Sequence, residues 1–217
     1  NVHLECVPTR EAQYLRLLEI AKTANTETAF LYRDNESAVV LVDLLLRHGV
    51  AFALAKPKMN FFKTSIVQDI VAHLSLAVNP YDTDALDRLC NHGVFFLKKE
   101  QLNYAINNSR RKHITVYDAL EGQMKYVPWK NRDSASIFRN VMNRISNANT
   151  YDAITILLEA GYARYLRKEG LDTGRLEILQ ILAKQEPTIP GFLNRLQELE
   201  KWMRCGWAAR PENKIIL

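Results

Sequence analysis

Basic side chains gather between residues 98 and 144, where ten cations stand against four carboxylates. Residues 1–80 hold eight basic and eight acidic side chains, so the whole net charge of +5 belongs to the later part of the chain. A local excess of this size attracts polyanions such as nucleic acid. The strongest candidates for phosphate contact are Lys98, Lys99, Arg110, Arg111 and Lys112. The alternative is an ordinary solvated helical surface.

A second group of polar residues follows an apolar run. Ala29-Phe30-Leu31-Tyr32 is typical of a strand that is buried on both faces, and Arg33-Asp34-Asn35 comes directly after it. In parallel sheets, functional residues usually lie at the carboxyl ends of strands. Arg33 and Asn35 are therefore candidate site residues, although they could simply form the turn after the strand.

Motifs that would mark an enzyme centre are missing from the sequence. It has no G-x-x-x-x-G-K-[ST] loop for nucleotide phosphates and no G-x-G-x-x-G fingerprint. The three cysteines and five histidines lack the close spacing of a zinc site. We therefore predict no catalytic, cofactor or metal site in this chain, reduced thiols typical of a cytoplasmic protein, and no membrane partner.

The elements that must position these residues form two kinds of pattern. Strands are predicted near residues 2–7, 29–32, 50–54 and 214–217, with amphipathic helices between the first three. From residue 81 strand signals stop, and helices are predicted near 83–91, 98–107, 115–121, 134–148, 150–159, 173–185 and 189–204. The fold class is therefore α/β, mostly helical, in which a parallel sheet carries an all-α insertion.

Several segments resemble the UvrD, Rep and PcrA helicases of superfamily 1. Residues 29–37 are similar to that family's "ailyRsNaqS" strand and turn, and the double aromatic Phe61-Phe62 is similar to its "FFeRkEIKD" segment. Residues 82–91 resemble "dDdaAfeRiiN", residues 158–162 with 175–177 resemble "sGy…RleNl", and residues 214–217 resemble the strand before "TiHsaKGLEf".

This resemblance implies a fragment of an ATP-dependent DNA helicase that moves 3′ to 5′ in repair or replication. Residues 1–80 and 212–217 would belong to a partial RecA-like motor domain, 2A, and residues 81–211 to the helical 2B insertion domain. Arg33 and Asn35 match family residues that approach the backbone of single-stranded DNA. ATP and Mg would bind the intact helicase, with the phosphate loop outside this chain, so the fragment is not expected to be active alone.

The sequence also departs from the family pattern. The duplex-contacting "tPkRGIG" segment is absent, and residues 92–99 read HGVFFLKK instead. DNA, single-stranded or forked, is the expected partner, together with repair or replication proteins. Two alternatives stay open, namely a protein–protein interaction module without DNA contact, and an unrelated nucleotide-binding α/β domain with a helical cap.

Overall fold

The chain packs into two compact units. A computed structural model describes residues 2–54, 60–90, 92, 98–124, 134–171, 173–204 and 215–217. Unit 1 comprises residues 1–62 and 196–217, and unit 2 comprises residues 63–195. By its packing, the helix that follows Phe61-Phe62 therefore belongs to unit 2.

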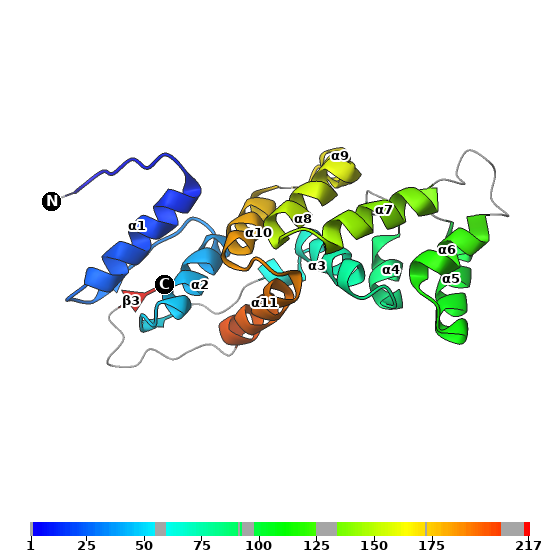
Figure 1. Cartoon of the computed structure of the whole chain (residues 1–217). Helices are drawn as coiled ribbons and strands as arrows, with labels where there is room; N and C mark the ends of the chain where they lie inside the picture. Colours follow the sequence, from blue (N-terminus) through cyan, green and yellow to red (C-terminus); the bar gives the residue numbers. More distant parts are fainter. Residues whose placement is uncertain are drawn as a thin grey trace. The chain divides into compact units, whose positions relative to one another are not determined.

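Unit 1 contains a small parallel sheet. Its strands are β1 (Thr28–Ala29), β2 (Phe52–Ala53) and β3 (Ile215–Ile216), in the order β1-β3-β2. Ile215 pairs with Thr28 on one side and with Phe52 on the other, and both pairings are parallel. The described C-terminal residues thus fill the middle of a sheet whose outer strands lie in the first sixty residues (Figure 1). This confirms the predicted parallel sheet, and the strand predicted near 214–217 is found at Ile215–Ile216.

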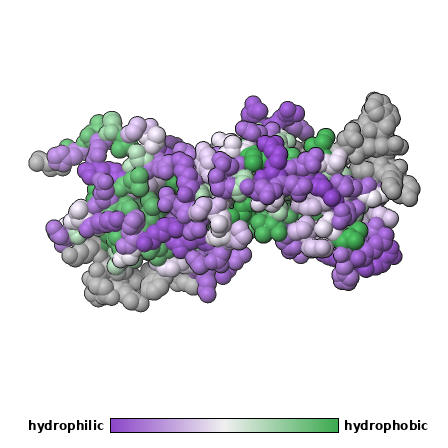
Figure 2. All heavy atoms as spheres, viewed as in Figure 1, coloured by the Kyte–Doolittle hydropathy of each residue, from purple (hydrophilic) through white to green (hydrophobic). Residues whose placement is uncertain are grey.

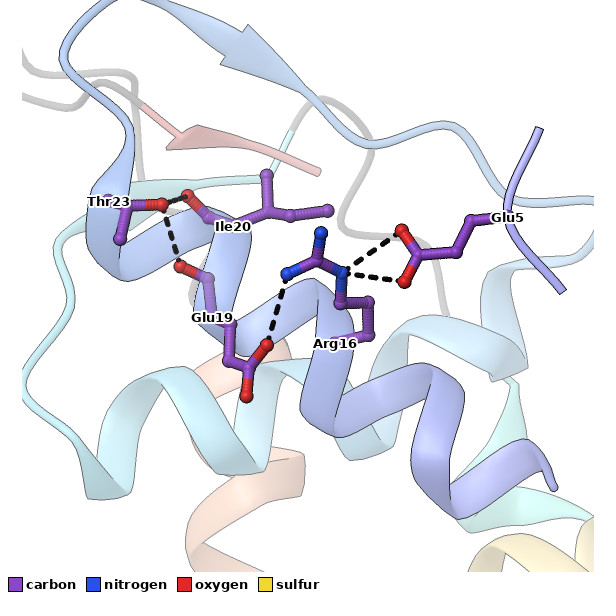
Figure 3. A network of polar contacts seen from close by, with 5 residues as sticks. All are labelled: Glu5, Arg16, Glu19, Ile20 and Thr23. Atoms are coloured by element: carbon purple, nitrogen blue, oxygen red, sulfur yellow. Dashed lines mark hydrogen bonds and ion pairs between the residues drawn. The ribbon is translucent and has the colours of Figure 1, made fainter. Parts of the chain in front are cut away.

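The strand predicted at residues 2–7 is wrong. This segment pairs with no described strand, and Val2 and Leu4 are exposed. It is attached instead through Glu5, whose carboxylate accepts a hydrogen bond from Arg16 Nε at 3.0 Å, while Arg16 Nη1 donates to Glu19 at 3.1 Å (Figure 3). The alternation of apolar and polar residues lacked a partner strand, and without one the backbone cannot form a ladder.

Two helices lie in the N-terminal part of unit 1. Helix α1 (Arg10–Thr23) starts where Thr9 Oγ1 accepts a hydrogen bond from the Ala12 amide at 3.1 Å. Helix α2 (Ala38–Arg47) is buried along almost its whole length, because its sequence is nearly all apolar. Gly49 follows it with φ of 65°, the left-handed conformation that glycine adopts without steric cost.

The double aromatic lies in the core of unit 1. Phe61 begins the short helix η2 (Phe61–Lys63), and its side chain is fully buried. Phe62 is also buried, and the two rings meet edge to face with centroids 5.1 Å apart. Core packing, rather than contact with a ligand, is therefore the role of these aromatics.

The described residues of unit 2 contain helices and no strand, as predicted. They form α3 (Ser65–Val78), α4 (Thr83–Leu89), α5 (Lys99–Lys112), α6 (Val116–Met124), α7 (Ser134–Ser146), α8 (Thr150–Leu157), the π-helix η4 (Leu158–Tyr162), α9 (Ala163–Lys168) and α10 (Gly174–Gln185). Helix α11 (Ile189–Arg204) crosses the boundary between the units. Gly161 lies within the π-helical turn with φ of 133°. No described helix has the length and hydropathy needed to cross a membrane.

A buried carboxylate ties several helices of unit 2 together. Asp69 of α3 is completely buried. Its oxygens lie 2.8 Å from Arg88 Nη2 and 2.9 Å from His92 Nδ1, and Tyr162 OH donates to Oδ2 at 3.1 Å. Charged and hydrogen-bonded partners offset the cost of removing a carboxylate from water. The network therefore fixes α3 against α4 and η4.

Candidate nucleic-acid interface

Helix α5 carries most of the predicted basic site on a well-anchored scaffold. Leu102, Ala105 and Ser109 form its buried stripe at the spacing expected of an amphipathic helix. Ser109 Oγ donates to the Ile114 carbonyl at 2.7 Å, and His113 ends the helix in a left-handed conformation. Helices α5 and α6 lie side by side at one end of unit 2 (Figure 1). The cations on α5 therefore project from a rigid element.

Arg110 has an internal role. Its Nε donates to Thr83 Oγ1 at 2.9 Å, and its Nη2 lies 2.8 Å from Asp84 Oδ1. Both partners lie in the first turn of α4, so Arg110 links α5 to α4. The ion pair is exposed to solvent, with 59% of the Arg110 side chain accessible. Its positive charge is locally offset by Asp84, which makes Arg110 the weakest phosphate candidate of the group.

Arg111 and Lys112, in contrast, are exposed in the last turn of α5. Lys98 and Lys99 are exposed at the other end of the helix, where the Lys98 amide donates to Gln101 Oε1 at 3.1 Å. Within the described part of the chain, no carboxylate pairs with these four cations. With a rise of 1.5 Å per residue, the two ends of the 14-residue helix α5 lie about 20 Å apart. Figure 2 shows hydrophilic residues over most of this end of the visible face.

The remaining cations of the basic stretch divide into three groups. Lys125, Lys130 and Arg132 lie outside the described residues. Arg139 is held by Asp118 and by Glu121, whose Oε1 lies 3.0 Å from its Nε, and its guanidinium lies 5.7 Å from the ring centroid of Tyr117. Hydrogen bonds from Thr115 and Arg139 lower the pKa of Asp118 below its usual value. Arg144 is exposed on α7.

The other predicted site residues lie in unit 1, after β1. Arg33 is exposed, and Asn35 begins the short helix η1 (Asn35–Ser37); its side chain lies outside the described structure. Asp34 organises the turn, since its Oδ1 accepts from the Ser37 amide and from Ser37 Oγ, both at 2.9 Å. Partial burial raises the pKa of Asp34, but the hydrogen bonds from Ser37 outweigh this, so the pKa lies below its usual value. Among the described residues, no carboxylate pairs with the Arg33 guanidinium.

Three further polar residues of α5 were missed when the sequence was read. Asn103, Tyr104 and Asn107 are exposed on this helix, and 51% of Tyr104 is accessible. A helical wheel drawn from the sequence would have placed them opposite Leu102 and Ala105. Because these side chains are uncharged, the charge pattern of the sequence does not indicate them.

The described residues contain no group of side chains with the composition of a metal centre. No cluster of three or more His, Cys, Asp or Glu among them could hold a metal ion. The buried Asp69 already faces an arginine, a histidine and a tyrosine hydroxyl, so its carboxylate is engaged within unit 2. The exposed cations of α5 are suited to binding an anionic polymer.

Comparison with known proteins matches the chain to DNA helicases. The model of the UvrD-like helicase C-terminal domain matches residues 9–127. The putative ATP-dependent DNA helicase YjcD of Bacillus subtilis is 25% identical over 179 residues, which cover 79% of this chain and 23% of that protein.

Two further relatives are similar over shorter stretches. The ATP-dependent DNA helicase PcrA of Bacillus subtilis is 27% identical over 150 residues, covering 66% of this chain and 20% of its own length. DNA helicase II of Haemophilus influenzae is 26% identical over 113 residues, covering 52% of this chain and 15% of that protein. The chain thus spans less than a quarter of the length of each of these relatives.

Proposed function

Because the chain belongs to the UvrD-like helicase C-terminal domain family, we propose that it serves as the DNA-contacting part of an ATP-dependent DNA helicase. The intact enzyme would move 3′ to 5′ on DNA during repair or replication. The observation that carries the proposal is the set of exposed cations on α5, Lys99, Arg111 and Lys112, without a carboxylate partner among the described residues.

The two units would correspond to two parts of the helicase. Residues 1–80 and 212–217 would form a piece of the RecA-like domain 2A, and residues 81–211 would form the helical 2B insertion domain, although helix α3 packs with unit 2. Support comes from the strand order, in which β3 lies between β1 and β2 although the helices of unit 2 separate it from them in sequence. That connectivity is expected when a helical domain is inserted into an α/β domain. The border between the two family domains at residue 80 stays a prediction.

Binding of ATP and Mg is assigned to the rest of the helicase. The sequence contains no phosphate loop, and the described residues offer no metal cluster. The residues of this chain would not hydrolyse ATP by themselves. Instead, these residues would bind DNA and orient it relative to the motor domains.

DNA contact would be mainly electrostatic. A guanidinium binds phosphate oxygens in a planar, bidentate manner, while an ammonium acts as a point charge. Arg111 and Lys112 would supply such contacts from the end of α5, and Arg33 with Asn35 would approach the single strand from the turn after β1. Contacts of this kind fix the position of the polymer without reading its sequence.

The test is fluorescence anisotropy of a labelled single-stranded oligonucleotide with the 217-residue chain, in a series of salt concentrations. The double variant Arg111→Gln/Lys112→Gln should weaken binding and reduce the slope of log K against log salt by roughly 1 to 1.5, because each single-strand phosphate contact contributes about 0.7. The matched control is Arg167→Gln/Lys168→Gln, an exposed cation pair in the last turn of α9. Equal losses in both variants would show that only net charge matters.

Two further measurements test the proposal. The Arg33→Ala variant should also weaken single-strand binding, since it removes the exposed guanidinium beside β1. The intact protein should hydrolyse ATP faster when DNA is added, and an intact protein without DNA-stimulated hydrolysis would refute the helicase assignment.

A protein–protein interaction module is the second candidate. It is favoured by exposed apolar residues of unit 2, since 57% of Ile137 and 44% of Val78 are accessible. Association with a repair or replication protein that is insensitive to salt and needs no DNA would support this candidate over the first.

A further inference from the structure

The solvent side of α5 combines an aromatic ring, two amides and a guanidinium. We define the α5 outer face as Asn103, Tyr104, Asn107 and Arg111, which are all exposed. Asn107 stands four residues after Asn103 and three after Tyr104, and Arg111 four after Asn107, so all four share one side of the helix, opposite its buried stripe. Residues seven apart, such as Tyr104 and Arg111, are separated by roughly 10 Å along the helix axis.

The side chains of this face have no structural task within the described part of the molecule. Tyr104 is 51% accessible, and none of the described residues forms a hydrogen bond or ring contact with it. The same holds for the amides of Asn103 and Asn107. By comparison, the tyrosines that stabilise unit 2 are engaged, because Tyr117 donates to the Leu76 carbonyl at 2.9 Å and Tyr162 donates to Asp69. The aromatic surface of Tyr104 is thus available to an external partner.

The charge around the face selects the kind of partner. Arg111 lies on it, Lys99 and Lys112 flank it at the two ends of the helix, and Glu100 is the only carboxylate of α5. Glu100 lies on the same side one turn before Tyr104, so the positive charge of the face is concentrated at Arg111, toward the end of the helix. An accessible ring about 10 Å from an unpaired guanidinium suits a polymer that presents flat, apolar faces beside negative charges. Unpaired nucleotides have this combination, whereas the bases of a duplex stack on one another and offer no free face.

We propose that the α5 outer face binds unpaired bases of a single-stranded nucleic acid. Tyr104 stacks on one base, Asn103 and Asn107 form hydrogen bonds with base edges or sugar oxygens, and Arg111 pairs with a phosphate of a neighbouring nucleotide. The proposal rests on the DNA contact proposed above for the same helix. It adds that the contact involves bases as well as backbone, and that it therefore prefers single strands to duplex.

The test compares two ligands that have the same phosphates. Binding of the 217-residue chain to a labelled oligothymidylate is measured beside binding to an abasic strand of equal length, by anisotropy at one low salt concentration. The wild-type chain should bind the thymidylate more tightly. Tyr104→Ala should weaken thymidylate binding by about fivefold or more, the low end for one base–aromatic stack, and should leave abasic binding unchanged.

Two control variants separate stacking from general effects. Tyr104→Phe keeps the ring and should retain most of the thymidylate affinity. Tyr151→Ala removes a partly exposed ring of α8, whose centroid is 5.6 Å from Lys184 Nζ in the wild-type chain. This variant should change neither affinity. Circular dichroism of each variant verifies that the helices are intact.

The outcomes distinguish the two proposals. If the wild-type chain binds both strands equally and Tyr104→Ala changes nothing, the base contact is refuted while phosphate contact through α5 stands. If Tyr104→Ala weakens both ligands alike, the ring supports the cations structurally and the base contact is again refuted. If the wild-type chain binds neither strand, both the base contact and the proposed DNA contact fall.

Discussion

Because His73 is buried, we predict that unit 2 loses stability as the solution is acidified from pH 7.5 to pH 5. His73 lies on α3 and is almost completely inaccessible. Its Nδ1 lies 2.7 Å from the Asp69 carbonyl oxygen, which assigns the neutral ring as the donor, and its ring meets Tyr162 edge to face at 5.6 Å. Burial lowers the pKa of His73 to about 4; the bond to Asp69 opposes this effect, and the nearby His92 adds to it.

The sign and size follow from proton linkage. The pKa of His73 is lower in the folded chain than the ordinary value of about 6.5, so the unfolded chain takes up the proton first as the pH falls. Stability is therefore lost between pH 6.5 and about 4, by up to about 1.4 kcal/mol per pH unit. From pH 7.5 to pH 5 the loss of unfolding free energy from this one group is roughly 2 kcal/mol.

Urea unfolding followed by far-UV circular dichroism at both pH values measures this loss. His73→Gln can still donate to the Asp69 carbonyl but does not titrate, so it should be less stable at pH 7.5 and lose roughly 2 kcal/mol less than wild type on acidification. The control His3→Gln changes an exposed histidine and should behave like wild type. If His73→Gln showed the same acid loss as the wild-type chain, His73 would not be the group that couples folding to pH, and the reasoning would be wrong.

Three further variants test the packing described above, each by urea unfolding. Tyr162→Phe removes one donor to the buried carboxylate of α3 and should cost about 1–2 kcal/mol. Arg139→Met should cost about 1 kcal/mol, because the ion pairs it loses are partly exposed, and the pKa of Asp118 should rise toward its ordinary value in an NMR titration. Phe61→Ala should cost about 3–5 kcal/mol of stability, because it leaves a cavity in the core. Leu31→Ala, at a residue that is 97% accessible, should change stability little. Equal effects of the two substitutions would contradict the core role of the double aromatic.

Much of the fold was predictable because the signals are local. Most helices from residue 83 onward begin within a residue or two of their predicted starts, since apolar spacing and caps such as Asp82, whose Oδ1 accepts from the Ala85 amide at 2.9 Å, are local signals. Helix α5 runs five residues beyond its predicted end, and α9 was not predicted. The strand at residues 2–7 failed for the opposite reason. Alternation in sequence is not sufficient for a strand, which also needs a neighbour to pair with.

The sequence alone determined the classes of element, the family and the position of the basic stretch, because periodicity and motif residues depend only on near neighbours. Only the tertiary structure decided which cations are available for a ligand. Arg110 and Arg111 are adjacent and look equivalent in sequence, yet Arg110 is paired with Asp84, 26 positions away, while Arg111 faces solvent. The helical rotation of about 100° per residue separates the two side chains, and the packing of α4 against α5 supplies a carboxylate to only one of them.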